Sequence, residues 1–456
     1  MSEKTRKLFG TDGVRGTANV HPMTPELALS LGQAAAYVFR RRSGRRPRIL
    51  IGKDTRLSGY MFETALAAGI ASMGVDVLQV GPIPTPGLAF LAVDMRCDAG
   101  AMITASHNPY QDNGIKFFGR DGYKLADEIE ARIESLIGSD ELKAGRAPAD
   151  KVGRARRIED AVGRYVVFLK NTFPRERVLD GLKVVLDCAN GAAYKVAPTV
   201  LDELGADVTL IGAEPNGRNI NDGVGSVFPE RTAERVRELG ADIGIALDGD
   251  ADRAILVDET GRILDGDEVI GTCARALADR KALRGGGVVA TVMSNFGLER
   301  WLQGLGLELV RTQVGDRYVV EAMRAGGYNL GGEQSGHVVF GDLSTTGDGM
   351  ITALQVLADM ASSGRRLSEC TAGFERYPQV LLNVDVSEKK PFESMPGVQA
   401  CKREIEATLA GRGRVLLRYS GTESRARVMV EGEDSGEVDT LAEQLADEIR
   451  REIGSA

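Results

Sequence analysis

The sequence predicts an α/β protein: three related α/β domains with mixed, largely parallel sheets, followed by a C-terminal α+β domain. Three observations lead to this fold class. Short runs rich in β-branched residues alternate with helical patterns, which is typical of parallel sheets. One order of strand, loop, helix, glycine and strand occurs three times. The order of predicted strands and helices changes after about residue 370. The chain of 456 residues is long enough for several domains at roughly 150 residues each.

Each repeat begins with a strand and a helix and returns to a second strand. The first starts with "RILIGKDTR" at Arg48, the second with "LKVVLDCANG" at Leu182 and the third with "GVVATVMSNFG" at Gly287. Each then adds a third apolar strand that ends in a polar loop. Ligands of open parallel sheets bind outside the carboxyl ends of the strands. The three loops therefore predict one site that is assembled from three domains.

The part after residue 370 has a different pattern. "YPQVLLNVDV" is a predicted strand, "GVQACKREIEATL" a helix, "GRVLLRYSGTESRARVMVEG" two strands around a loop, and "EVDTLAEQLADEIRREI" an amphipathic helix. "TAGFERYP" precedes them as a candidate hinge. The expected domains are residues 1–155, 156–256, 257–370 and 371–456.

The composition excludes several classes of protein. A net charge of -8 and 5% aromatic residues argue against nucleic-acid binding. The start, "MSEKTRKLFGTDG", lacks the apolar region of a signal peptide, and no apolar run is long enough to span a bilayer. The five cysteines are scattered without a CxxC pair, which predicts reduced thiols. We expect a cytoplasmic protein with no nucleic-acid or membrane partner.

"DGDADR" places three carboxylates directly after the apolar run "IGIAL". Asp248, Asp250 and Asp252 alternate, and alternate residues of an extended segment point the same way. Three converging carboxylates suit a hard cation such as Mg²⁺, with one further oxygen ligand. An EF-hand is excluded because Arg253 replaces its required glycine. A solvated acidic turn is the plainer alternative.

"TASHNPYQDNGIK" follows another apolar run, "AGAMI", and holds far more polar and turn-forming residues than a plain loop needs. Ser106 is a candidate for the further cation ligand, or it stabilises the turn. A Ser106–His107 nucleophilic pair is disfavoured because neighbouring side chains on extended backbone diverge. Lys116, at the end of the loop, is a candidate acid/base or electrostatic stabiliser; the alternative is an exposed surface charge.

Three further loops suit a phosphorylated sugar. In "GEQSGH", Glu333, Ser335 and His337 alternate between glycines that allow close approach of backbone to a ligand. "TDGVRG" places Arg15 in a glycine-rich loop suited to a phosphate. "RYSGTESRAR" combines hydroxyls, loop amides and guanidinium groups as a phosphate cradle, with a polar hairpin turn as the alternative. The candidate phosphate ligands in that last loop are Arg418, Ser420, Gly421, Thr422 and Arg427.

With these loops in hand, the chain resembles the α-D-phosphohexomutase superfamily. "TASHNP", "DGDADR", "GEQSGH" and "SGTE" occur in the superfamily's order, and "FGTDGVRG", "GPIPTP", "PNGRNIN", "QVGDRYV" and "TTGDG" strengthen the match over essentially the whole chain. The motifs are most similar to those of bacterial members that interconvert glucosamine 6-phosphate and glucosamine 1-phosphate, feeding UDP-N-acetylglucosamine and cell-wall synthesis. Gln334 favours this branch, because phosphomannomutases and phosphoglucomutases commonly have Met there. Ser424 departs from the usual Pro after "SGTE".

The resemblance implies four domains around a deep cleft and a phosphoserine enzyme that works through a 1,6-bisphosphate intermediate. Ser106 is the implied phosphoserine and, with the three aspartates, a ligand of Mg²⁺. Glu333 and Ser335 are the implied sugar ligands. Glucosamine 1,6-bisphosphate or glucose 1,6-bisphosphate is the expected activator, a phosphosugar the expected partner, and a homodimer the candidate assembly. The predicted catalytic residues are Ser106, Lys116, Arg15 and His337.

Three other functions compete with this prediction. A phosphomannomutase/phosphoglucomutase is the nearest, within the same superfamily. A phosphosugar hydrolase would lose its phosphoserine to water, but the fourth domain is expected to shield that group. A non-catalytic sugar-phosphate sensor is disfavoured because candidate nucleophile, metal ligands and phosphate cradle are all present.

Overall fold

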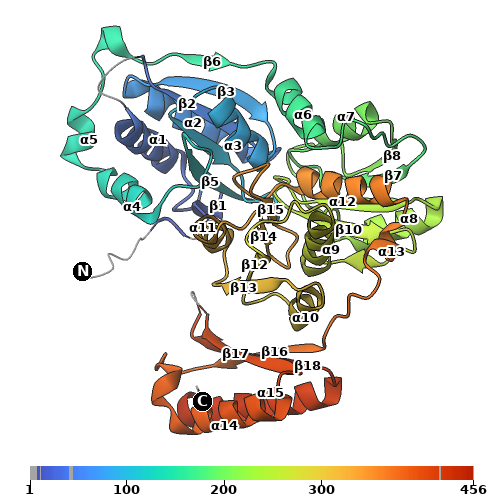
Figure 1. Cartoon of the computed structure of the whole chain (residues 1–456). Helices are drawn as coiled ribbons and strands as arrows, with labels where there is room; N and C mark the ends of the chain where they lie inside the picture. The colour runs from blue at the N-terminus through green and yellow to red at the C-terminus, as the bar shows by residue number, and fades with distance from the viewer. Residues whose placement is uncertain (1–7, 11, 41–44, 421–422, 455–456) are drawn as a thin grey trace.

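A computed structural model describes residues 8–10, 12–40, 45–420 and 423–454. Four sheets follow one another along the chain, each with its own helices (Figure 1). Three of the sheets are mixed and the fourth is antiparallel, which confirms the predicted fold class. Within these residues, no helix combines the length and the apolar character needed to cross a membrane.

The first sheet has six strands in the order β1-β5-β4-β2-β3-β6. Its strands are β1 (Val14–Thr17), β2 (Arg48–Lys53), β3 (Asp76–Pro82), β4 (Ala99–Ile103), β5 (Asp112–Gly119) and β6 (Ala155–Arg157). Its helices are α1 (Pro25–Phe39), α2 (Ser58–Ser72), α3 (Thr85–Asp94), α4 (Asp127–Leu136) and α5 (Asp140–Ala144).

The second and third sheets have the orders β11-β10-β9-β7-β8 and β13-β12-β14-β15. The second part comprises α6 (Ala161–Asn171), β7 (Lys183–Asp187), α7 (Val196–Glu203), β8 (Asp207–Ile211), α8 (Glu230–Leu239), β9 (Ile243–Leu247), β10 (Ala254–Asp258) and β11 (Ile263–Leu264). The third comprises α9 (Gly266–Asp279), β12 (Gly287–Thr291), α10 (Phe296–Gly304), β13 (Glu308–Thr312), α11 (Asp316–Gly326), β14 (Leu330–Gly332), β15 (Val338–Phe340), α12 (Gly349–Ser363) and α13 (Leu367–Cys370).

The three sheets share one strand order. In each, the third strand of the repeat pairs with the first, and the first with the second, all in parallel: β4-β2-β3, β9-β7-β8 and β14-β12-β13. An antiparallel strand then follows the third one, namely β5, β10 or β15. The glycine between helix and second strand is Gly74, Gly205 or Gly306, with φ of 82°, 95° and 71°. The left-handed region explains why glycine is used there.

The C-terminal part is a separate small layer of one sheet and two helices, drawn in red at the bottom of Figure 1. Strands β16 (Gln379–Asp385), β18 (Arg425–Gly432) and β17 (Gly413–Tyr419) are antiparallel, with β18 in the centre. Helices α14 (Pro396–Leu409) and α15 (Ser435–Ile453) pack on one face.

The hydrophobic cores follow a different division from the sheets. One cluster of buried side chains runs from the first sheet through the second to the third, whereas the C-terminal part has a core of its own. Two of the expected domain boundaries fall inside strands: 155/156 lies in β6, and 256/257 lies in β10. The candidate hinge, residues 371–378, connects α13 to β16. It therefore joins the part of the chain with the shared hydrophobic cluster to the C-terminal part with its own core.

Candidate functional site

The loop between β4 and β5 buries Ser106 against the second domain. The serine is 1% exposed and has a φ of 51°, in the left-handed region. Its backbone N–H donates to the Thr104 hydroxyl at 2.9 Å. Its own hydroxyl donates to Oδ2 of Asp248 at 2.6 Å. The sequence-predicted nucleophile and the acidic loop therefore meet directly.

His107 lies closer to Ser106 than the sequence predicted. Because Ser106 is left-handed rather than extended, its Oγ lies 3.2 Å from Nδ1 of His107, and the expectation that the two side chains diverge is wrong. The pair still lacks the properties of a nucleophile and its base. Arg253 Nη1 lies 3.2 Å from the same ring nitrogen, and burial together with the Arg253 charge lowers the pKa of His107 to about 4. His107 is therefore neutral near pH 7.

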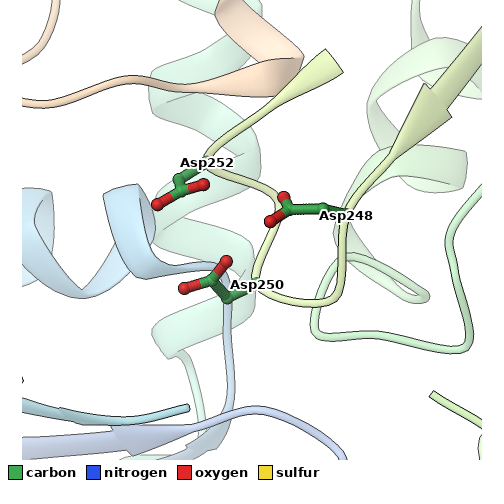
Figure 2. A group of neighbouring side chains, drawn as sticks. All are labelled: Asp248, Asp250 and Asp252. Carbon is green, nitrogen blue, oxygen red and sulfur yellow. The ribbon is translucent and has the colours of Figure 1, made fainter. Parts of the chain in front are cut away.

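Asp248, Asp250 and Asp252 converge, as Figure 2 shows, and one carboxylate oxygen of each lies within 4.8 Å of the others. The expected extended segment is absent; a turn between β9 and β10 brings the side chains together, with Ala251 at a φ of 56°. All three side chains are buried. A solvated acidic turn is thereby excluded.

The acidic loop has the properties of a cation site. Oδ1 of Asp250 and Oδ1 of Asp252 are buried and have no hydrogen-bond donor among the described residues. Burial and the charges of Asp252 and Asp250 raise the pKa of Asp248 well above its ordinary value. Three buried carboxylates at this spacing, with Oδ1 of Asp250 lacking a donor among the described residues, fit a hard divalent cation, which prefers oxygen ligands.

Two side chains of the first domain hold Asp250 in place. The Thr85 hydroxyl, at the start of α3, donates to Oδ2 of Asp250 at 2.6 Å. Lys116 Nζ lies 3.2 Å from the same oxygen and is 2% exposed, which rules out the exposed surface charge considered from the sequence. Burial lowers the pKa of Lys116, but the surrounding carboxylates, with Asp12 first, outweigh it and raise this pKa overall.

Five charged side chains and His337 form a closed ring around the site. Lys116 Nζ lies 3.0 Å from Asp12 and 3.7 Å from Asp252. Lys124 Nζ contacts Asp12 at 2.5 Å and Asp316 at 2.6 Å. The sixth member, His337, closes the ring: its Nε2 lies 3.5 Å from Asp316 and its Nδ1 lies 3.6 Å from Asp252. The members come from three domains, so the ring connects them electrostatically.

His337 is held by a backbone group as well as by the ring. The Gly347 N–H donates to Nε2 of His337 at 3.1 Å, so that nitrogen accepts in the neutral ring and the proton lies on Nδ1, facing Asp252. Arg15 joins the same network through an ion pair with Asp12. Lys116 and His337 therefore contact the acidic loop, whereas Arg15 is connected to it through Asp12 and Lys116.

Replacing Lys124 by methionine should destabilise the protein. Lys124 is shared by two carboxylates whose side chains are 23% and 13% exposed, and removing one partner of a largely buried ion pair costs about 3 kcal/mol. Lys143→Met is the matched control, because Lys143 pairs with Asp140 on the surface and such pairs contribute under about 1 kcal/mol. Urea unfolding measures both. Equal losses in the two variants would contradict a structural role for the ring.

The sugar-loop candidates lie between β14 and β15. Ser335 is exposed, and Glu333 is half-buried with its Oε1 accepting from the Gly315 N–H at 3.2 Å. Gln334 turns away from them: its Nε2 lies 3.3 Å from Oδ2 of Asp265, the N-cap of α9. The Gln334 amide therefore connects the sugar-loop candidates to the start of α9.

The phosphate-loop candidates lie on β17 and β18. Arg418 and Arg427 are direct cross-strand neighbours, and Nε of each is buried without a hydrogen-bond partner among the described residues. Burial and the neighbouring Arg427 lower the pKa of Arg418. The Ser420 hydroxyl accepts from the Glu423 N–H at 3.3 Å. Two adjacent guanidinium groups with free donors suit an anion. Two more candidates, Gly421 and Thr422, lie outside the described residues.

Sequence reasoning missed three members of the ring: Asp12, Lys124 and Asp316. Asp12 stands in "FGTDGVRG" and Asp316 in "QVGDRYV", two segments already singled out as motifs, so their acidic residues were available signals. Lys124 stands in "DGYKL", which carries no such signal.

Four family models match the chain in order. Three describe phosphoglucomutase/phosphomannomutase alpha/beta/alpha domains: domain I over residues 6–144, domain II over 163–261 and domain III over 265–377. The fourth describes the phosphoglucomutase/phosphomannomutase C-terminal domain, over residues 381–448.

Curated relatives and solved structures match over nearly the full length. A phosphoglucosamine mutase of Geobacter metallireducens is 59% identical over 449 residues, covering 98% of this chain and 99% of the relative. One of Syntrophotalea carbinolica is 57% identical, covering 98% of both. A Burkholderia thailandensis phosphoglucomutase/phosphomannomutase family protein has a TM-score of 0.79 at 23% identity, covering 97% of both chains. An Aspergillus fumigatus N-acetylphosphoglucosamine mutase, solved with GlcNAc-6P and magnesium, has a TM-score of 0.66 at 19% identity, covering 98% of this chain and 96% of that one.

Proposed function

Since this chain belongs to the phosphoglucosamine mutases of the phosphohexomutase superfamily, we propose that it interconverts glucosamine 6-phosphate and glucosamine 1-phosphate through a phosphoserine at residue 106. One observation carries the assignment of the nucleophile. The buried Ser106 hydroxyl lies 2.6 Å from Asp248, beside two further buried carboxylates whose Oδ1 atoms accept no hydrogen bond from the described residues. A phosphate on this oxygen would face the cation site directly.

The proposed reaction consists of two transfers. Phosphoserine 106 gives its phosphoryl group to the free hydroxyl of the sugar monophosphate, which yields a 1,6-bisphosphate and free serine. The bisphosphate turns over, and its other phosphoryl group returns to the serine oxygen. The covalent phosphoenzyme splits one difficult transfer into two easier ones. The proton of the sugar hydroxyl passes to the serine oxygen that leaves. His337, beside the acidic loop, is the candidate to relay it, whereas the raised pKa of Lys116 keeps that side chain protonated as an electrostatic stabiliser.

A magnesium ion would be held by Asp248, Asp250 and Asp252 together with the phosphate on Ser106. When bound, it neutralises charge on the transferring phosphoryl group. Lys116 would place a second, fixed positive charge beside the same group, since its Nζ is buried against two of these carboxylates. The bound magnesium in the Aspergillus fumigatus structure supports the choice of cation.

The remaining site residues are proposed to hold the substrate. Glu333 and Ser335 would grip the sugar, with Glu333 placed to pair with the substrate's amine. The phosphate that is not reacting would be held by Arg418, Ser420, Gly421, Thr422 and Arg427. Glucosamine 1,6-bisphosphate or glucose 1,6-bisphosphate would load Ser106 and sustain turnover. The water-soluble sugar phosphates that it uses favour a cytoplasmic location for the enzyme.

A coupled assay that compares glucosamine, glucose and mannose phosphates tests this function. With Mg²⁺ and glucose 1,6-bisphosphate present, we expect the highest kcat/KM for glucosamine phosphate, because a cationic amine forms a stronger charge-assisted bond to Glu333 than a hydroxyl does. Equal or reversed specificity would assign the chain to the phosphomannomutase/phosphoglucomutase alternative. Release of inorganic phosphate without sugar isomerisation would indicate a hydrolase.

Arg427→Ala should weaken binding of both the 1-phosphate and the 6-phosphate. One cradle must hold whichever phosphate is not reacting, and the free guanidinium donors on β17 and β18 treat the two ends alike. The variant should also need more added bisphosphate, because the intermediate escapes before it turns over. Steady-state kinetics in both directions measure this, with Arg451→Ala on the exposed face of α15 as the control. Loss of affinity for only one isomer would contradict a shared cradle.

A further inference from the structure

The backbone carbonyls of the loop that carries Ser106 accept hydrogen bonds from a buried arginine, Arg56. Arg56 is fully buried, and its Nη2 donates to the carbonyl oxygens of Ser106 and Asn108, each at 2.8 Å. Its Nη1 donates to the carbonyl of Pro109 at 2.6 Å. Its Nε donates to Asp54 at 2.8 Å, in an ion pair in which both side chains are 0% exposed. The guanidinium group is thus fixed on one side and spans three carbonyls on the other.

A side chain of the second domain contacts two of these carbonyls. Nδ2 of Asn221 lies 2.9 Å from the Ser106 oxygen and 3.0 Å from the Asn108 oxygen. Asn221 ends the "PNGRNIN" segment, and its own N–H donates to the Ala189 carbonyl at 2.9 Å. The motif therefore places a hydrogen-bond donor of the second domain, which also carries the acidic loop, against the backbone of the Ser106 loop.

These donors fix a strained conformation. Ser106 has a φ of 51°, which a residue with a Cβ adopts only when its surroundings impose it. The direction of the Ser106 carbonyl sets this conformation and, through it, the direction of Oγ toward Asp248. Gly249 of the acidic loop also approaches this carbonyl: a Cβ on Gly249 would lie 2.6 Å from the oxygen. The peptide after Ser106 therefore has little room to rotate.

We infer that Arg56 and Asn221 are positioning residues for phosphoryl transfer at Ser106, an inference that rests on the proposed phosphoserine function. Four hydrogen bonds, two from each side chain, hold the same two carbonyls and so aim the serine oxygen at the cation site. Both residues act through the backbone of Ser106, away from the sugar and phosphate loops. Their loss should slow transfer into and out of the serine equally, because both transfers use one oxygen. Binding of the sugar phosphate should be unaffected.

The test uses Asn221→Gly and Arg56→Lys in the full chain. Glycine removes the amide donor and tolerates the φ of 58° at this position, and lysine keeps the charge but lacks the planar fork. After loading of Ser106 with glucose 1,6-bisphosphate, the transfer rate to glucosamine 6-phosphate is measured in a single turnover. We expect a loss of about 10- to 100-fold in Asn221→Gly and about 100-fold or more in Arg56→Lys, the scale of a misplaced reacting atom. The dissociation constant for glucosamine 6-phosphate should stay within about twofold, since neither side chain touches the proposed sugar ligands.

Asn216→Ala is the matched control, because Asn216 lies in the same segment, is exposed, and its side chain accepts from the Arg218 N–H within that segment. It should transfer at the wild-type rate. Wild-type rates in both Asn221→Gly and Arg56→Lys, or a loss of affinity matching the loss of rate, would overturn the inference. If Arg56→Lys does not fold, Asn221→Gly alone decides. If the wild-type protein cannot be loaded at Ser106, the proposed function itself fails, a result distinct from fast transfer in the variants.

Discussion

Replacing Ser106 by alanine should abolish mutase turnover, with a loss of at least about 10⁴-fold in kcat, the scale on which removal of a covalent nucleophile acts. The reason is geometric. The Ser106 hydroxyl is the group that the β4–β5 loop presents to the acidic loop, at 2.6 Å from Asp248, and His107 beside it is neutral and contacts Arg253. The substitution therefore removes the hydroxyl that would carry the phosphoryl group toward Asp248.

Intact mass and peptide mapping complete this test. A fraction of the purified wild-type protein should carry one phosphate on the peptide that contains Ser106, and Ser106→Ala should carry none there. Ser135→Ala is the control, because Ser135 is exposed on α4 and its hydroxyl donates to the Arg132 carbonyl of the same helix. Full activity in Ser106→Ala, or phosphate found only on other peptides, would exclude the phosphoserine mechanism.

Asp250→Asn should reduce kcat by roughly a thousandfold at fixed Mg²⁺, equivalent to about 4 kcal/mol of lost charge stabilisation. Asparagine keeps the size of the side chain and can still accept from Thr85, but it removes one negative charge and turns a free carboxylate oxygen into an amide group. Treatment with EDTA should abolish wild-type turnover, and added Mg²⁺ should restore it.

Direct metal binding separates the cation site from other effects of this substitution. Titration with Mn²⁺, followed by its electron paramagnetic resonance signal, should show one tight site in the wild type and a much weaker one in Asp250→Asn. Asp279→Asn, at the exposed end of α9, is the control and should bind as the wild type does. Turnover that persists in EDTA, or equal Mn²⁺ affinity in the wild type and Asp250→Asn, would contradict a metal role for this residue.

The repeat was predictable because its strands and helices follow from the order of residue types within each short segment. The β-branched runs at Arg48, Leu182 and Gly287 became β2, β7 and β12, the first strand of each unit. Mixed sheets were predicted, but the antiparallel pairing of the strand after each polar loop was not. Pairing between strands depends on contacts that a periodic pattern does not encode.

The site was predictable where its residues stand in a motif and unpredictable where they meet only in space. The acidic loop converges as expected, although through the left-handed Ala251 and not an extended segment. Side chains 50 and 115 residues distant hold the carbonyl of the left-handed Ser106, so local reasoning misjudged its neighbour His107. Lys124 and Asp316 are 192 residues apart, and nothing in the sequence around Lys124 marks their pairing.

The common strand order of the three sheets has an evolutionary consequence. In each sheet the polar loop joins the third strand to the antiparallel strand after it, outside the hydrogen-bonded ladder that fixes the order β4-β2-β3, β9-β7-β8 or β14-β12-β13. Copies of one ancestral unit could therefore change these loops independently while every copy kept its architecture. Under the proposed function, one copy specialised in the nucleophile, one in the cation and one in the sugar. Duplication followed by division of labour is thus sufficient to explain how a single supersecondary unit came to supply a three-part site.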